Sequence, residues 1–442
     1  MISTRPWRDC REDIQNLDLI RPVGRVSQLV GMVIEVEGLG GPVGSLCRIE
    51  ISRHESPVLC EVIGFRGGTL LLMPYKEAAG VAPGQVVTLV ARQLTVPTGD
   101  ALLGRVLNGL GQPIDGGPPL HREARTRLNG TPPPALSRQR HSAPLSTGLR
   151  ALDSLVTVAR GQRMGIFAGS GVGKSVLLGM LARNARVQVN VLALIGERGR
   201  EVREFIERDL GPEGLARSVV VVVTSDESAV MRVKGAQTAM SIAESFRDSD
   251  HDVLFLMDSA TRFAMALREI GLAAGEPPTT KGYTPSVFSA LPRLCERAGW
   301  SATNAMTAFF TVLIEGDDIH DPIGDAMRAI LDGHLMLSRD LARQHRYPAI
   351  DVLGSISRLR NDVVDDKVKQ AGVKIATWLT ALEENRDLIN IGAYVAGSDP
   401  LVDEARAKEQ AIIEFLRQGI DEKASIEESF AGLLQLIAAE VA

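Results

Sequence analysis

Cysteine, metal-binding motifs and long apolar runs are all scarce in this chain of 442 residues. The four cysteines (Cys10, Cys47, Cys60 and Cys295) form no C-x-x-C pair, and the seven histidines form no H-E-x-x-H pattern. Such spacing argues against a disulfide framework and a zinc site and favours a reducing compartment. No apolar run approaches the length needed to span a bilayer, and charged side chains interrupt the first 17 residues. We therefore expect neither a signal peptide nor a membrane-spanning helix.

Aromatic residues and positive charge are also in short supply. Aromatics make up 4% of the chain and the net charge is −5 at pH 7, so no general attraction to nucleic acid or anionic lipid is expected. Hydrophobic residues make up 45% and charged residues 23%, which is typical of a soluble globular protein. The length is too great for one core and suits two or three domains.

A glycine-rich loop follows the apolar run at residues 164–168 and precedes a helical pattern. The sequence Ala-Gly-Ser-Gly-Val-Gly-Lys-Ser matches the phosphate-binding loop, with alanine at its first position instead of glycine. Glycines let the backbone wrap a phosphate chain, and the helix N-terminus adds a positive dipole. Lys174 is expected to reach the β- and γ-phosphates of a nucleotide, and Ser175 to hold Mg²⁺. The candidate binding residues are Ala168, Gly169, Ser170, Gly171, Val172, Gly173, Lys174 and Ser175.

Two further apolar runs end in a carboxylate. Asp258 closes the run that begins at Val253, where an aspartate can order the water shell of Mg²⁺, although it could also cap a following helix. Glu197 closes the run that begins at Val191 and could orient or deprotonate an attacking water, or be a surface charge.

Several arginines and one tyrosine stay open on residue type alone. Arginines near strand ends or in loops could offset charge on the γ-phosphate, but a single arginine is more often solvated or salt-bridged. Tyr347, in a Tyr-Pro loop, could stack on a base or simply pack. The arginines concerned are Arg198, Arg200, Arg203, Arg262 and Arg358.

Composition and periodicity divide the chain into four parts. Residues 1–22 form a tail or a docking segment, and residues 23–96 contain short strands with turn punctuation, which suggest a small closed β-barrel. Residues 97–358 alternate apolar runs with helical patterns, indicating a parallel sheet covered on both faces, after a proline-rich linker near 115–145. Residues 359–442 form a small helical domain, whose apolar stripes are expected to be core rather than partner surface.

Six motifs in this order together resemble the flagellar type III protein-export ATPase family, a relative of the catalytic subunit of rotary ATP synthases. The resemblance extends from about residue 24 to about residue 440. The motifs are the phosphate loop, Gly-Glu-Arg-Gly-Arg-Glu-Val at 196–202, Met-Asp-Ser-Ala-Thr-Arg-Phe-Ala at 257–264, Gly-Glu-Pro-Pro-Thr-Thr-Lys-Gly-Tyr at 275–283, Ile-Leu-Asp-Gly-His at 330–334, and Tyr-Pro-Ala-Ile-Asp followed by Ser-Ile-Ser-Arg at 347–358.

The resemblance implies a role for each candidate residue. Glu197 corresponds to the catalytic carboxylate, Asp258 to the carboxylate that orders the water on Mg²⁺, and Arg262 to an arginine beside the γ-phosphate. Tyr347 corresponds to the tyrosine that stacks on adenine, and Arg358 to a finger that reaches a neighbouring subunit's nucleotide.

The resemblance also implies an assembly. It implies a β-barrel, a RecA-like P-loop ATPase core of α/β class and a C-terminal helical domain, in a homo-hexamer that uses ATP and Mg²⁺ to dissociate, unfold and load export substrates. Expected partners are a stator-like regulatory export protein at the N-terminus, a coiled-coil stalk in the pore, export chaperones, substrates and the membrane export gate. The expected location is the cytoplasm, peripheral to the inner membrane.

Three other functions remain open at this level. A virulence-type secretion ATPase is scarcely separable from a flagellar one. A rotary ATP synthase subunit is disfavoured by the phosphate loop and by the lack of an acidic lever motif in the C-terminal part. A hexameric RNA translocase is disfavoured because the barrel lacks a basic and aromatic strand face.

Overall fold

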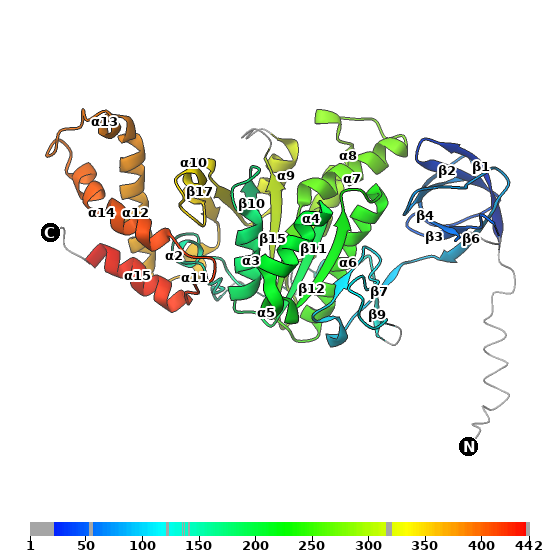
Figure 1. Ribbon diagram of the computed structural model, residues 1–442, viewed down its shortest axis with the longest axis horizontal. Coiled ribbons are helices and arrows are strands. Elements are labelled where there is room, and N and C mark those ends of the chain that lie inside the picture. Colours follow the sequence, from blue (N-terminus) through cyan, green and yellow to red (C-terminus); the bar gives the residue numbers. More distant parts are fainter. Residues whose placement is uncertain are drawn as a thin grey trace, which may run out of the picture. The chain divides into compact units, whose positions relative to one another are not determined.

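The computed structural model describes residues 22–52, 56–120, 123–134, 136, 138–139, 142–314 and 321–438. The chain divides into two compact units (Figure 1). The first runs to Leu94 and includes Leu272–Glu276, and the second comprises Thr95–Gly271 and the chain from Pro277 onward. The tail or docking segment expected at the N-terminus lies outside the described residues, except for Pro22.

The first unit is a closed six-stranded barrel in the order β1-β2-β5-β4-β3-β6, which confirms the barrel predicted from the sequence. Inward-facing apolar residues fill it, including Cys47 and Cys60, which pair across β3 and β4 but remain free thiols. Burial raises the pKa of the Cys60 thiol to about 12, so it packs as a small apolar group. The strands are β1 (Val23–Val30), β2 (Val33–Glu37), β3 (Leu46–Ile49), β4 (Val58–Arg66), β5 (Thr69–Pro74) and β6 (Val86–Ala91).

The second unit is built on a sheet with the order β17-β16-β10-β15-β13-β11-β12-β8. Strands from β16 to β8 are parallel, as predicted, whereas β17 and the short β14 pair antiparallel at β16 and β15. The strands are β8 (Val106–Leu107), β10 (Arg163–Ala168), β11 (Val189–Glu197), β12 (Ser218–Thr224), β13 (Val253–Asp258), β14 (Gly299–Trp300), β15 (Ala305–Leu313), β16 (Gly333–Leu337) and β17 (Ile350–Ser357).

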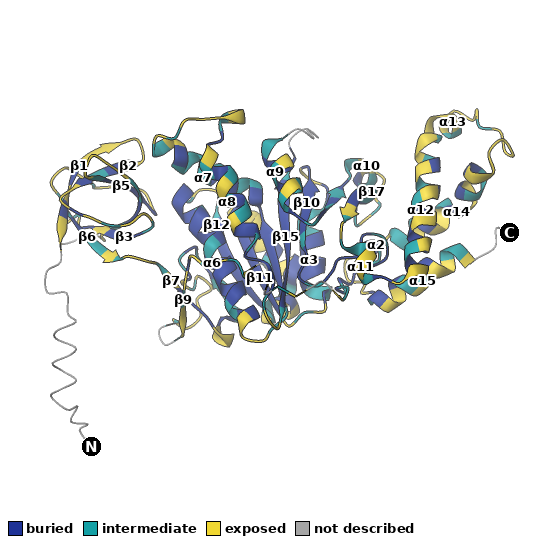
Figure 2. Ribbon diagram, turned by 180° about the vertical axis from the view of Figure 1, so that it is seen from behind, coloured by how far each residue is buried: buried dark blue, intermediate teal, exposed yellow. Residues whose placement is uncertain are grey.

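Helices cover both faces of this sheet, because its strands are apolar on both sides (Figures 1 and 2). On one face Leu194 and Val222 join the core that includes α3; on the other, Ile195 and Val223 meet α6 at Gly235. The helices are α2 (Arg150–Leu155), α3 (Lys174–Asn184), α4 (Gly199–Glu204), the π-helix η3 (Phe205–Leu210), α5 (Gly211–Ala216), α6 (Ala229–Asp248), α7 (Ala260–Ala273), α8 (Pro285–Cys295), α9 (Pro322–Ile330) and α10 (Arg339–Arg343).

The region predicted as linker is mostly irregular. It contains one short strand, β9 (Arg125–Arg127), which pairs antiparallel with β7 (Thr95–Pro97) at the start of the second unit. The connections also include the 3₁₀ turns η1 (Asp100–Leu102) and η4 (Thr280–Gly282).

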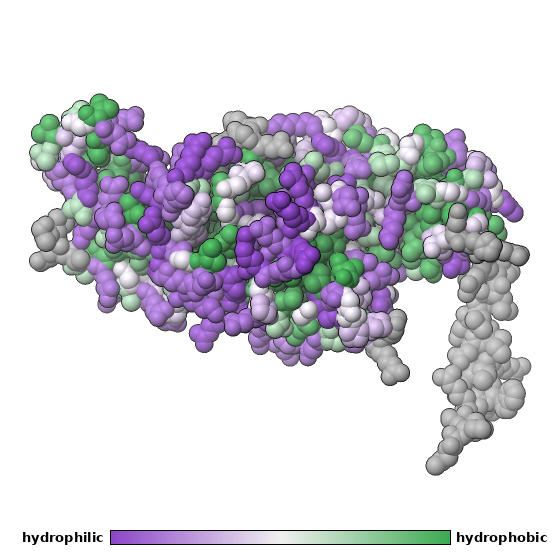
Figure 3. Space-filling view, in the orientation of Figure 1, coloured by the Kyte–Doolittle hydropathy of each residue, from purple (hydrophilic) through white to green (hydrophobic). Residues whose placement is uncertain are grey.

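Helices form the C-terminal part, and their predicted apolar stripes pack into one core around the fully buried Trp378. A capping box starts the last helix, since Ser425 and Glu428 exchange hydrogen bonds of 2.7 and 3.1 Å. Apolar side chains are exposed near α13, at Leu388 and Ile391 (Figure 3). The helices are α11 (Arg360–Val363), α12 (Asp366–Glu384), α13 (Arg386–Asn390), α14 (Pro400–Leu416) and α15 (Ile426–Ala438). Among the described residues, no helix combines the length and apolarity that crossing a bilayer requires.

Candidate active site

The phosphate loop joins β10 to α3 as predicted. Gly171 and Gly173 have φ values of 78° and 89°, a region that favours glycine, so the loop needs glycine at both positions. Gly173 caps α3, and no side-chain hydrogen bond occupies that cap in the described structure. The first-turn N–H groups of α3 therefore face the loop, where an anion is favoured.

Lys174, the first residue of α3, lies between two carboxylates. Its Nζ is 2.5 Å from Asp258 Oδ1 and 3.4 Å from Glu197 Oε1. Burial alone would lower the pKa of this lysine, but the charges of Asp258 and Glu197 outweigh burial and raise it. Lys174 therefore stays cationic, as a phosphate ligand must.

The two carboxylates reach Lys174 because parallel strands end at the same edge of the sheet. Glu197 ends β11 and Asp258 ends the adjacent β13, with Leu194 in register with Asp258. Thr311 on β15 donates a 2.7 Å hydrogen bond to Asp258 Oδ1, the oxygen that Lys174 contacts. Burial and the charge of Asp258 raise the pKa of Glu197, while Lys174 opposes that shift. A raised pKa makes Glu197 a better acceptor for a proton from water than an ordinary glutamate.

Ser175, Glu197 and Asp258 line one small cavity next to the phosphate loop, closed on another side by Phe205 of η3. The described residues contain no cluster of three or more acidic, histidine or cysteine side chains that could cage a metal. One hydroxyl and one nearby carboxylate suit Mg²⁺, which keeps several waters and completes its shell with substrate phosphates. The donor set therefore fits Mg²⁺ bound together with a nucleotide.

Arg262 lies beside Glu197. A Cβ built on Gly196 would lie 2.9 Å from the Cβ of Arg262, so only glycine lets the arginine stem pack here. The Arg262 Nε is buried and has no hydrogen-bond acceptor among the described residues. Such a group has donor capacity left for a ligand.

Tyr347 lies over the phosphate loop, with its ring 3.5 Å from where a Cβ on Gly173 would be. It lines a cavity of about 360 Å³ whose lining is largely apolar and includes Val176 and Met180 of α3. The cavity is also lined by Gln418, Gly419 and Ile420, which follow α14 and which the sequence interpretation did not identify.

The loop after α14 is tied to the rest of this unit by Gln418. Its backbone N–H donates to Tyr347 O at 2.9 Å, and its side chain donates to Gly148 O at 2.8 Å and accepts from Arg150 N at 2.9 Å. Gly419, just after the last periodic residues of α14, is an ordinary helix-stop signal, and it was the one local hint of this loop.

Arg358 lies at the opposite end of the strands from the phosphate loop, which we call the amino edge of the sheet; the phosphate loop lies at the carboxyl edge. Ser357 is in register with Gly333 and thereby with Met164, near the start of β10, whereas the phosphate loop follows the end of that strand. The separation along the strands alone is roughly 13 Å, with β16 between β17 and β10. The structure thus joins Lys174, Ser175, Glu197, Asp258, Arg262 and Tyr347 at one edge and leaves Arg358 at the opposite one.

A phosphate loop after a central strand, with two carboxylates on neighbouring strand ends, defines a RecA-like nucleoside triphosphatase core, here accompanied by a barrel and a helical part. Family models agree with this division. The ATP synthase alpha/beta family beta-barrel domain matches residues 26–89, the nucleotide-binding domain of that family matches 148–357, and the T3SS EscN ATPase C-terminal domain matches 364–435.

Individual relatives narrow the class. A flagellum-specific ATP synthase of Bacillus subtilis is 48% identical over 98% of this chain and 99% of its own length. A type 3 secretion system ATPase of Xanthomonas euvesicatoria is 47% identical over 94% of both chains. The assembled ATPase EscN of enteropathogenic E. coli superposes with a TM-score of 0.88 at 40% identity, covering 95% of this chain and all of EscN. EscN in complex with its central stalk EscO gives 0.86, with the same identity and coverage. The chain belongs to the type III protein-export ATPases of the ATP synthase alpha/beta family, and it is an ATPase.

Proposed function

We propose that this chain hydrolyses Mg-ATP to drive flagellar protein export, dissociating, unfolding and loading substrates at the membrane export gate. The observation that carries the proposal is the position of Lys174, held between Asp258 and Glu197 at the carboxyl edge of the sheet. A cation so placed exchanges its carboxylate contacts for phosphate oxygens when a nucleotide enters.

The chain's own groups then divide the work. Lys174 and the first-turn N–H groups of α3 bind the β- and γ-phosphates, and Arg262 supplies a further cation on the γ side. Glu197, freed from Lys174, orients the attacking water and takes its proton. Ser175 and Asp258 would hold Mg²⁺, directly and through its water, and the ion would supply neutralisation of the charge on the phosphate oxygens.

The apolar cavity beside Tyr347 suits the base of the nucleotide. Adenine can stack on the tyrosine ring and fill the space that Gln418, Gly419 and Ile420 close from the far side. Because Gln418 bonds to the Tyr347 carbonyl, base binding acts on both walls of the cavity.

Arg358 acts in trans in this proposal. It lies at the edge of the sheet opposite its own phosphate loop, and among the described residues no carboxylate lies within ion-pair distance of its exposed side chain. A ring of six copies, like the assembly that the EscN relative forms, offers a neighbouring nucleotide to such a side chain.

The remaining parts of the proposal concern partners and place. By analogy with the EscN–EscO complex, a coiled-coil stalk occupies the pore of the ring. A stator-like regulator binds the N-terminal segment, chaperones deliver substrates, and these contacts hold a cytoplasmic protein at the periphery of the inner membrane. No nucleic acid takes part.

The flagellar pathway is favoured over a virulence pathway because five flagellar relatives are 48–49% identical to this chain, against 44–47% for two secretion relatives. A sixth flagellar relative, of Borreliella burgdorferi, is 43% identical. Deletion of the gene in its native cell tests the choice. We expect loss of flagellar filaments, restored by the wild-type chain and not by Lys174→Ala. Filaments that persist while another secretion system stops working would contradict the flagellar assignment.

A further inference from the structure

Two hydrogen bonds to other segments hold Arg358, the residue that follows β17. Its backbone N–H donates to Asp332 O at 3.0 Å, and its Nη2 donates to Arg328 O at 3.2 Å, near the end of α9. An arginine that stabilises charge in a transition state must be held in place before the reaction, since the benefit depends on preorganisation. The position of Arg358 therefore depends on the residues that fix Asp332, its hydrogen-bond acceptor, and Ser357, its neighbour in the chain.

Gln162 is fully buried and connects Asp332, whose carbonyl accepts from the Arg358 backbone N–H, to Ser357, the residue before Arg358. Its Nε2 donates to Asp332 O at 3.2 Å and to Ser357 Oγ at 3.1 Å. Its Oε1 accepts from Ala159 N at 2.7 Å, so the amide orientation is set by a backbone donor. The Ser357 hydroxyl donates onward to Thr157 O at 2.8 Å. One side chain thus holds both the carbonyl that Arg358 binds and the residue before Arg358.

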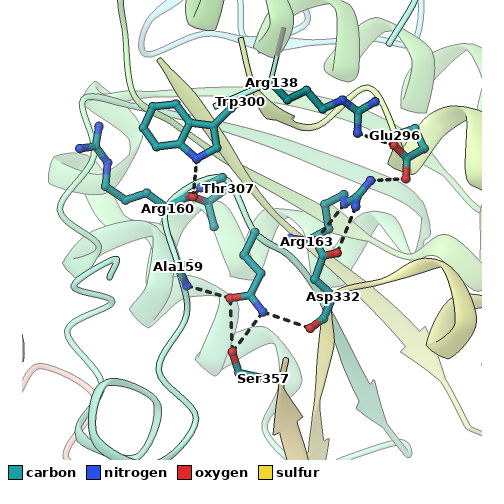
Figure 4. A network of polar contacts seen from close by, with 11 residues as sticks. Arg138, Ala159, Arg160, Arg163, Glu296, Trp300, Thr307, Asp332 and Ser357 are labelled. Carbon is teal, nitrogen blue, oxygen red and sulfur yellow. Dashed lines mark hydrogen bonds and ion pairs between the residues drawn. The ribbon is translucent and has the colours of Figure 1, made fainter. Parts of the chain in front are cut away.

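The Asp332 side chain is fixed separately by Arg163 (Figure 4). Its carboxylate accepts from the Arg163 backbone N–H at 3.1 Å, from Nε at 2.9 Å and from Nη2 at 3.0 Å. Arg163 also pairs with Glu296, which Arg138 contacts at 2.6 Å. Such bidentate, charge-assisted bonds hold a side chain in one geometry.

These groups line the amino edge of the sheet and belong to no step assigned to the carboxyl edge. Arg163 begins β10, Asp332 precedes β16, and Ser357 ends β17, so the network joins three neighbouring strands. Its polar atoms bond to one another and to the backbone, whereas the Arg358 side chain beside it is exposed.

We propose that Gln162, acting through Ser357 and Asp332, is the positioning residue that holds Arg358 ready for the neighbouring subunit's nucleotide. The inference rests on the proposed trans role of Arg358. It assigns Gln162, only six residues before the start of its own phosphate loop, to catalysis in the next subunit's site.

Mixed rings test this assignment, because variants that damage the same side of an interface cannot complement each other. Gln162→Leu keeps the volume and loses the amide. We expect this variant to bind ATP with wild-type affinity, to assemble, and to turn over about 10- to 100-fold more slowly, the scale of a misplaced group. Mixed with Glu197→Gln it should regain activity, because some interfaces then pair an intact Glu197 with a well-held Arg358. Mixed with Arg358→Ala it should regain none.

Substitutions of Ser357 remove only one hydroxyl from the network and have a matched control. Ser357→Ala should slow turnover in the same complementation class, and Ser357→Thr, which keeps the hydroxyl, should restore it. Ser241 is the control: its hydroxyl also donates to a backbone carbonyl, Leu128 O, at 2.8 Å and accepts a side-chain bond, here from Arg297. Ser241→Ala should leave turnover unchanged.

The outcomes separate the inference from the function it rests on. Failure of Arg358→Ala to complement Glu197→Gln would remove the trans role itself. If that pair complements, rescue of Gln162→Leu by Arg358→Ala would overturn the inference, and so would wild-type turnover in Gln162→Leu. Should Gln162→Leu fail to assemble, Ser357→Ala decides: wild-type turnover, or rescue by Arg358→Ala, would likewise overturn it.

Discussion

The two edges of the central sheet hold their polar groups in different ways. At the carboxyl edge Lys174 is shared unequally between Asp258, at 2.5 Å, and Glu197, at 3.4 Å. At the amino edge Asp332 accepts three bonds from Arg163, all within 3.1 Å. The first set leaves room for a phosphate chain to take over its contacts, whereas the second is complete without a ligand. The carboxyl edge is suited to exchanging hydrogen-bond partners with a ligand, and the amino edge to holding Arg358 in a fixed position.

The largest effect on ATP hydrolysis should come from a substitution at the carboxyl edge. Lys174→Ala removes the cation between the two carboxylates, so we expect hydrolysis to be abolished and nucleotide binding to weaken. Steady-state ATPase assays and equilibrium nucleotide titration check both. Lys374→Ala is the control, because Lys374 pairs with Glu404 at 3.0 Å and lines neither the cavity at Ser175 nor the cavity beside Tyr347. Hydrolysis at the wild-type rate in Lys174→Ala would refute the phosphate-loop assignment.

A substitution of Arg358 at the amino edge should reduce turnover almost as much. An arginine supplied in trans contributes roughly 10³–10⁵ in turnover. Arg358→Ala should therefore bind ATP normally and hydrolyse it slowly at every protein concentration, while wild-type specific activity rises with concentration as rings form. Activity measured alongside the assembly state checks this. Full wild-type activity per subunit in a demonstrated monomer would make the enzyme self-contained.

Glu197→Gln should preserve binding of Mg-ATP and slow turnover at least ~100-fold, the usual contribution of a positioned base. The pH profile of kcat/KM in the wild type gives an independent check. Only ionised Glu197 can accept a proton, and burial and Asp258 raise its pKa above the ordinary 4.5. Activity should therefore fall as pH drops through that raised pKa, so that the acid limb starts at a higher pH than an unperturbed carboxylate would give. Weakened ATP binding in Glu197→Gln would mean instead that Glu197 is structural.

Asp258→Asn should raise the Mg²⁺ concentration needed for half-maximal activity, since a neutral amide orders the water shell of the ion less strongly. A magnesium titration at fixed ATP measures the shift, and Thr311→Val, which removes only the hydrogen bond to Asp258, should give a smaller one. An unchanged titration for Asp258→Asn would remove this residue from the magnesium site.

The smallest effect is expected at the base. Tyr347→Ala should weaken ATP binding by about 1–3 kcal/mol, the scale of base–aromatic stacking, and Tyr347→Phe should keep most of the affinity. Titration with a fluorescent nucleotide checks the pair. Equal affinity of Tyr347→Ala and wild type would return Tyr347 to ordinary packing.

The carboxyl edge was more predictable from the sequence than the amino edge, for a physical reason. An apolar run that ends in glycine or a carboxylate is a local pattern, so the phosphate loop, Glu197 and Asp258 were recognisable within single segments. Gln162 and Ser357 act through contacts with residues about 170 to 200 positions away, which leave no periodic trace. The strand β17 was not predicted from the sequence either. Its pairing with β16 is irregular between His334 and Met336, and such an irregularity interrupts the alternation of buried and exposed side chains by which a strand is recognised.

The same reasoning explains the missed wall of the base cavity. Gln418 meets Arg150 and Gly148 across about 270 residues, and only the folded chain brings them together. The C-terminal part, by contrast, was predicted to be helical from its local periodicity, and the structure there consists of helices.

Mixing Arg358→Ala with Glu197→Gln tests the central claim most directly, namely that the two edges of one sheet serve two different nucleotides. Each variant alone should be nearly inactive. Rings verified by native mass spectrometry to contain both should regain activity, because some interfaces combine the intact Glu197 of one subunit with the intact Arg358 of the next. Verified mixed rings that stay as inactive as either parent would contradict the claim.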